Sequence, residues 1–101
     1  MRIEVLFVPG CPNYAPAVKR VKEILAAESL TSEIEEIPVN SVEDARALAF
    51  PGSPTIRING NDVEPVDADM SRLACRLYAN GTGMPSEEVL RRAIARGKEL
   101  E

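Results

Sequence analysis

Histidine and tryptophan are absent from this sequence, and aromatic residues make up only 4% of it. Without histidine, the protein cannot use histidine general bases, histidine-activated nucleophiles or histidine metal ligands. Its two cysteines cannot close a tetrahedral structural zinc site on their own. The scarcity of aromatic residues argues against stacking platforms for nucleobases or sugars. In a cytosolic chain, two cysteines indicate catalytic, redox or metal-linked thiols rather than a structural disulfide.

The chain also lacks a surplus of positive charge and a long apolar run. It has 12 basic and 16 acidic residues and a net charge of −4, which leaves no basic surface for a nucleic-acid backbone. No apolar run approaches the ~20 residues of a membrane span, and the first residues do not resemble a signal peptide. We therefore predict one cytoplasmic domain over residues 1–101 that binds neither nucleic acid nor a membrane and uses no cofactor.

Hydrophobic periodicity and turn residues divide the chain into alternating strands and helices. The pattern predicts strands over residues 3–8, 33–39, 55–58 and 62–66. It predicts helices that begin near Tyr14, Ser41, Met70 and Pro85. Asn59-Gly60 between the last two strands is typical of a two-residue hairpin turn.

The predicted order is therefore β-α-β-α-β-β-α-α, an α/β fold with a four-stranded mixed sheet flanked by helices. The first two strands should be parallel, and the hairpin should lie beside the first strand. In this arrangement the first strand ends, and the third begins, at the same end of the sheet. The chain after residue 66, which carries Cys75, should therefore start beside the turn that carries Cys11.

Cys11 lies between the first predicted strand and the first predicted helix. The N–H groups and positive dipole end of a helix stabilise a thiolate, which is the reactive form of cysteine. Two helix registers remain open. If the helix begins at Pro12, then Pro16 falls in its interior. If Asn13 is the N-cap, Pro16 lies in the first turn and Cys11 belongs to the preceding loop, which weakens the stabilisation.

The sequence resembles the thioredoxin-like fold at two motifs, Cys11-Pro12-Asn13-Tyr14 at a helix start and Ser53-Pro54 before a strand. By element order the resemblance covers roughly residues 2–66 and the last helix. It implies a cis Ser53-Pro54 bond that abuts Cys11. It also implies a ligand surface for a peptide or thiol, formed by Pro12, Asn13, Tyr14, Ser53 and Pro54.

One position departs from that family. Tyr14 stands where the family has its second cysteine, so a dithiol cycle within this motif is impossible. Single-cysteine members form mixed disulfides, bind thiol ligands or have lost activity. The simpler interpretation of Tyr14 is that it packs as the first apolar residue of its helix.

The chain is also similar to small thioredoxin-like proteins labelled organomercurial (alkylmercury) lyase-like. The shared features are Gly10-Cys11-Pro12, Gly52-Ser53-Pro54-Thr55-Ile56 and Cys75-Arg76-Leu77-Tyr78. The lyase reaction needs two thiolates and a carboxylate around one soft metal. By this resemblance Cys11 and Cys75 would supply the thiolates, and Asp67 or Asp69 the carboxylate.

Cys75 lies on the predicted helix whose apolar stripe is Met70, Leu73, Ala74 and Leu77. On a helix Cys75 would lie away from that stripe, and Arg76 would decorate the surface. We expect Cys75 to be the resolving thiol, or the second soft ligand, for Cys11. An inert cysteine remains the alternative.

Three functions follow from these observations. The first is thiol–disulfide exchange or thiol-ligand binding through Cys11, with Cys75 as a second thiol. The second is binding of a soft metal or organomercurial by both thiolates. The third is a non-catalytic interaction module. The predicted partner is a thiol or disulfide substrate or a soft metal ion, and the chain should be a monomer or a weak homodimer.

Overall fold

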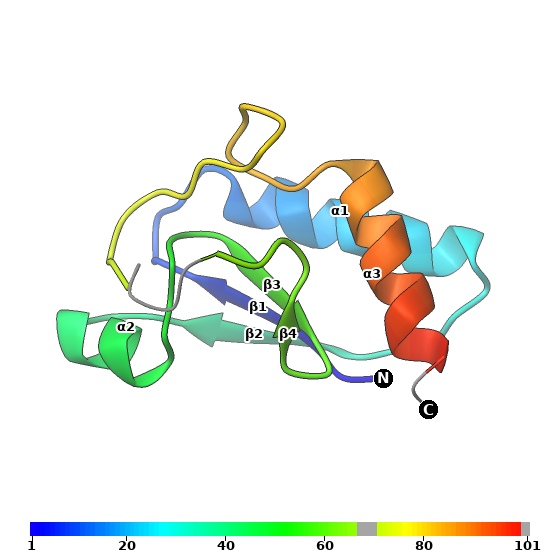
Figure 1. Ribbon diagram of the computed structural model, residues 1–101, viewed down its shortest axis with the longest axis horizontal. Coiled ribbons are helices and arrows are strands. Elements are labelled where there is room, and N and C mark those ends of the chain that lie inside the picture. Colours follow the sequence, from blue (N-terminus) through cyan, green and yellow to red (C-terminus); the bar gives the residue numbers. More distant parts are fainter. Residues whose placement is uncertain (67–70, 100–101) are drawn as a thin grey trace.

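A four-stranded open mixed sheet with three helices forms the architecture of this protein (Figure 1). The structure is a computed structural model that describes residues 1–66 and 71–99. The strands are β1 (Ile3–Phe7), β2 (Ile34–Pro38), β3 (Thr55–Ile58) and β4 (Asn61–Asp62). The helices are α1 (Tyr14–Ala27), α2 (Val42–Ala47) and α3 (Glu87–Glu99).

The sheet has the order β2-β1-β3-β4, with β1 inside it. β1 pairs in parallel with β2 and antiparallel with β3, and β3 pairs antiparallel with β4. The predicted neighbours and strand directions are therefore confirmed. Leu6 of β1 lies opposite Thr55 of β3, so the end of β1 and the start of β3 share one end of the sheet.

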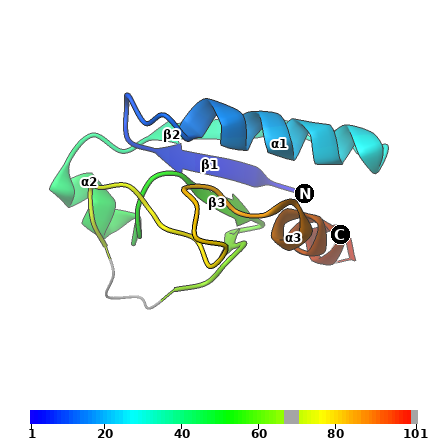
Figure 2. The ribbon, with the colours of Figure 1, turned by 90° about the horizontal axis from the view of Figure 1, so that it is seen from above.

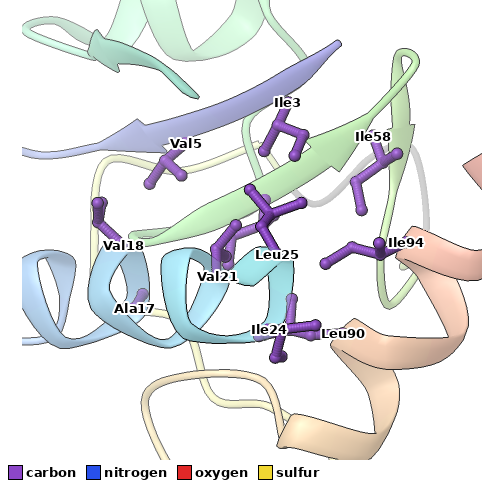
Figure 3. Packing of buried hydrophobic residues seen from close by; sticks show 11 residues of the cluster. Ile3, Val5, Ala17, Val18, Val21, Ile24, Leu25, Ile58, Leu90 and Ile94 are labelled. Carbon is purple, nitrogen blue, oxygen red and sulfur yellow. The ribbon is translucent and has the colours of Figure 1, made fainter. Parts of the chain in front are cut away.

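Alternate side chains of β1 fill two separate cores, as its continuous apolar sequence predicts. Ile3 and Val5 join the larger core, which α1 and α3 cover (Figure 3). Leu6 joins a smaller core with Phe50 and Ala45 of α2. Figure 2 shows α1 over the β2 side of the sheet and α3 nearer β3. Of the helices in the described part of the chain, none combines the length and apolar character that a bilayer crossing requires.

The start of α1 follows the second of the two predicted registers. Asn13 is the N-cap residue and α1 begins at Tyr14. Pro16 therefore lies in the first turn, where its missing N–H costs no helical hydrogen bond. Cys11 belongs to the loop between β1 and α1.

The return strand is shorter than the sequence predicts. β4 ends at Asp62; the Val63 N–H still donates to the Ile56 carbonyl of β3 (3.0 Å), and the Asp62 side chain accepts from the Glu64 backbone N–H (2.8 Å), which forms a turn. The turn before it follows the prediction: Asn59 and Gly60 have φ values of 53° and 84°.

The predicted helix over residues 70–77 is wrong for its described part, because residues 71–78 form no helix. The backbone of this segment is instead bonded at alternate residues to the loop before β3. Arg72 donates its N–H to the Phe50 carbonyl, and Arg76 donates to the Ser53 carbonyl. Burial is reversed accordingly: Arg76 is buried, whereas Leu73 and Leu77 are 37% and 72% exposed. Met70, the first apolar residue of the predicted stripe, lies outside the described residues.

Candidate functional site

Cys11 lies in the loop that leaves β1, one turn before α1. Its N–H donates to the Val8 carbonyl (3.0 Å), and its carbonyl accepts from the Tyr14 N–H (3.4 Å). The Cys11 side chain is a free thiol and is partly exposed, and Pro12 beside it is exposed.

Asn13 follows in the same turn, but its side chain makes no capping hydrogen bond. The loop before α3 packs tightly on it. A Cβ atom placed on Gly83 would lie 2.1 Å from Asn13 Nδ2, so a larger residue at this position would require the Asn13 side chain to move. The loop that carries Gly83 thus lies against the Asn13 side chain, and Asn13 is partly buried.

Tyr14 packs against β1 and β2. Its ring stacks on Phe7 with a centroid separation of 3.8 Å, and its hydroxyl donates to the Glu36 carboxylate. This hydrogen bond, with smaller contributions from burial and the Glu36 charge, raises the pKa of Tyr14 above its ordinary value. The Tyr14 hydroxyl is therefore already bound within the chain.

Ser53 and Pro54 are buried at the same end of the sheet, and the bond between them is cis as predicted. Ser53 Oγ accepts from the Val8 N–H (2.9 Å), at the base of the Cys11 loop. The Ser53 N–H donates to the Ala74 carbonyl (2.8 Å), and its carbonyl accepts from the Arg76 N–H (3.0 Å). Ser53 therefore joins the loop that carries Cys11 to the segment that carries Cys75.

Cys75 is paired with Ser53 in an isolated parallel β-bridge, and its thiol is free and exposed. Its neighbours Ala74 and Arg76 make the two backbone bonds of that bridge. Figure 1 shows this segment in yellow, at the end of the sheet where β1 leads into α1. The Cys75 segment therefore lies at the end of the sheet where β1 ends, and it is not a helix; the start of the chain after residue 66, which was expected beside the Cys11 turn, lies outside the described residues.

Arg76 holds this segment in place, and sequence reasoning missed it. Its side chain is 2% exposed and forms a two-pronged ion pair with Asp62 (2.8 and 3.1 Å). It also donates to Thr55 Oγ1 and to the Glu64 carbonyl, and it lies 4.2 Å from the centre of the Tyr78 ring. The two-residue spacing of Arg76 and Tyr78 is a strand periodicity, which the helical interpretation of 70–77 overlooked.

Tyr78 fastens the other end of the segment. Its ring is buried, and its hydroxyl donates to the carbonyl of Pro54 (2.5 Å). Burial raises the pKa of Tyr78 far above its ordinary value, aided by the charges of Asp62 and Glu64, while Arg76 opposes the shift. The Pro54 carbonyl therefore accepts a hydrogen bond from the Tyr78 hydroxyl. The Ser53 carbonyl, on the other side of the cis bond, accepts one from the Arg76 N–H.

The described residues contain no group of three cysteine or carboxylate side chains that could hold a metal ion. Asp67 and Asp69, the carboxylates that the lyase-like resemblance implied, lie outside the described residues.

The sheet end thus gathers Cys11, Ser53, Pro54 and Cys75 on three hydrogen-bonded segments. Searches against family models, curated proteins and solved structures found no match.

Proposed function

We propose that this chain is a thioredoxin-like thiol protein that performs thiol–disulfide exchange through Cys11, with Cys75 as its second thiol. The parallel β1–α1–β2 unit, the antiparallel β3–β4 hairpin and the closing helix α3 support the thioredoxin-like assignment. A cis proline beside the cysteine loop supports it further.

The observation that carries the proposal is the position of Ser53. One buried residue bonds Val8, three residues before Cys11, and also bonds both neighbours of Cys75. Both thiols are free, and Cys11 is partly exposed while Cys75 is exposed. Two accessible thiols beside one sheet end are the minimum that a two-cysteine exchange cycle requires.

The chemistry proceeds by thiolate attack. The Cys11 thiolate attacks one sulfur of a substrate disulfide, a mixed disulfide forms, and the other substrate sulfur leaves as a thiolate. The Cys75 thiolate then attacks the Cys11 sulfur, releases the second substrate thiolate and leaves a Cys11–Cys75 disulfide. A dithiol reductant returns that disulfide to two thiols and is itself oxidised.

The second attack has a geometric requirement. A disulfide needs Cα atoms about 4.4–6.8 Å apart. Ser53 holds the Cys75 segment through two backbone bonds, and Arg76 holds it through its buried side chain. Resolution by Cys75 therefore requires the Cys11 loop and this segment to bring their Cα atoms within that range.

Insulin disulfide reduction with dithiothreitol as the electron donor tests the proposal. The unsubstituted protein should accelerate reduction, and Cys11→Ser should abolish the acceleration. Cys75→Ser should slow turnover and accumulate a Cys11 mixed disulfide, detected by intact mass spectrometry. Circular dichroism checks that both variants fold.

Equal acceleration by Cys11→Ser and the unsubstituted protein would contradict the proposal. Stoichiometric mercury(II) binding that is lost in Cys11→Ser, without any reductase activity, would replace it with the soft-metal function. If neither disulfide reduction nor mercury(II) binding changes when Cys11 or Cys75 is replaced, the interaction-module function remains.

A further inference from the structure

Residues 73–77 present an unpaired β-edge to solvent. Within the described chain, the backbone N–H and C=O groups of Leu73, Cys75 and Leu77 form no hydrogen bond. The intervening residues Ala74 and Arg76 bond inward to Ser53. At Cys75, where the chain forms its isolated bridge to Ser53, this alternation is that of a strand with one paired side and one open side, and Leu73 and Ala74 lie in a bend before it.

Side-chain burial alternates from Cys75 to Tyr78, whereas Leu73 and Ala74 before them are both exposed. Arg76 points into the protein, where Asp62, Thr55 and the Tyr78 ring hold it. Leu73, Cys75 and Leu77 are exposed, with the thiol between two apolar side chains. A strand added to this edge would find backbone partners, two apolar contacts and a sulfur at the centre.

We propose that this edge binds an extended, cysteine-bearing polypeptide strand with apolar residues two positions on either side of its cysteine. In an antiparallel hydrogen-bonded pair, opposed Cα atoms lie about 5.5 Å apart, which is within the range of a disulfide. The docked cysteine therefore lies opposite Cys75 at bonding distance. Because this docking does not involve Cys11, it goes beyond the exchange reaction proposed above.

The buried side-chain contacts that hold this segment on the sheet favour such docking. Arg76 and Tyr78 fix the edge before any partner arrives, so little ordering entropy is lost from this side. A second copy of the chain is the less suitable occupant. A stable dimer buries about 1,000 Å² or more in total, and a three-residue edge between two folded domains offers little area, whereas a flexible strand can follow the edge.

Covalent capture of the peptide by thiol–disulfide exchange needs no added oxidant. The Cys75 thiolate attacks the peptide sulfur of a peptide–cysteamine disulfide, the peptide–Cys75 disulfide forms, and cysteamine leaves as a thiolate. At equilibrium with excess cysteamine, the amount of peptide adduct reports the noncovalent docking.

The test uses the Cys11→Ser variant and the peptide acetyl-Thr-Val-Thr-Cys-Thr-Val-Thr-amide as its cysteamine disulfide. Two further peptides carry one N-methyl group each, on the cysteine nitrogen or on the nitrogen of the next residue. Only one of these nitrogens faces the edge in a given orientation. We expect the exchange equilibrium constant, from intact mass spectrometry, to fall about fivefold for one methylated peptide and to stay unchanged for the other.

A lower equilibrium constant for the peptide methylated on its cysteine nitrogen indicates antiparallel docking. A lower constant for the peptide methylated on the next nitrogen indicates parallel docking, and either result supports the proposal. The Cys75→Ser variant, which captures the peptides through Cys11, serves as the control and should not distinguish them. Equal effects of both methyl groups on Cys75 capture would overturn the proposal. So would formation of a Cys75–Cys75 dimer that the peptides do not displace, because the occupant would then be a second copy. None of these readouts requires the chain to reduce a disulfide catalytically.

Discussion

At the scale of single residues, Arg76 explains why a polar side chain occupies the interior of a small domain. A buried guanidinium is stabilised by pairing of its charge and by hydrogen bonds to its nitrogens, of which Nε of Arg76 has no partner among the described residues. Asp62 supplies the charge, and Thr55 and the Glu64 carbonyl supply further acceptors. The Arg76–Asp62 ion pair therefore holds the Cys75 segment on the sheet and also packs in the interior.

The substitution Asp62→Asn should therefore be costly. It leaves the Arg76 charge buried without a counter-charge, and we expect the free energy of unfolding to fall by about 3 kcal/mol. The matched control is Glu88→Gln, whose ion pair with Arg92 is 70% exposed on both sides and should cost less than ~1 kcal/mol. Urea unfolding followed by circular dichroism measures both. Similar losses for the two variants would contradict a special role for Arg76.

Part of the residue-level site could be predicted and part could not. Cys11 between β1 and α1 follows from the local sequence, whereas the cis Ser53-Pro54 bond was expected only from the resemblance of its motif to a known family. The partnership of Arg76 with Asp62 joins residues 14 positions apart through a fold that only the whole chain specifies. An isolated arginine in a sequence carries no sign that it will be buried.

At the scale of elements, the turn that leads into β3 depends on Gly52. Its φ is +136°, a conformation that side chains rarely adopt, and a Cβ there would lie 2.9 Å from the Arg76 Cβ. The loop and the Cys75 segment can approach this closely only because residue 52 has no side chain.

We therefore expect Gly52→Ala to lower the free energy of unfolding by at least about 2 kcal/mol, through backbone strain and overpacking together. Gly10→Ala is the matched control, because Gly10 also has positive φ (+89°) but nothing lies within 4 Å of an added Cβ. Thermal or urea unfolding of the two variants separates strain from packing. If both lose the same stability, the contact with Arg76 is unimportant.

The elements with strong, uninterrupted periodicity were predictable. β1, α1 and α3 have apolar patterns that match their period, and their predicted positions hold within a few residues. The segment 71–78 was not predictable in this way, because Leu73, Ala74 and Leu77 are spaced as on a helix. Their apolar side chains are exposed because the backbone bonds to Phe50 and Ser53, together with Arg76, impose an extended path.

At the scale of the whole molecule, the two cores on opposite faces of the sheet are closed by different means. α1 and α3 cover the larger core with aliphatic side chains. The smaller core has one short helix, α2. Beside it, the 71–78 segment is fixed to the sheet by polar contacts of Arg76 and Tyr78. Stability should therefore depend on the ionisation state of the groups that hold this segment.

Alkaline pH tests that dependence. Because burial raises the pKa of Tyr78 in the folded state, its contribution to stability is complete below about pH 10 and is lost as pH rises toward the folded value. The Tyr14→Phe variant keeps Tyr78 as its one tyrosine. In this variant we expect tyrosinate absorbance to appear together with the loss of circular dichroism.

Tyr78→Phe provides the comparison, because it preserves the buried ring without an ionisable group. Between neutral and alkaline pH, its free energy of unfolding should fall less than that of the unsubstituted protein. Ionisation of Tyr78 near pH 10 in a fully folded Tyr14→Phe variant would show that the hydroxyl is not held by Pro54 as the structure describes.

The anchored backbone on either side of Cys75 has a practical consequence for spectroscopy. A nitroxide or fluorophore attached to this sulfur would be carried on a base that is bonded to the sheet at both neighbouring residues. Its rotation would follow the tumbling of the entire domain instead of local loop motion. The same label would therefore report association with a larger partner as slower rotational correlation, even when the partner never touches the dye.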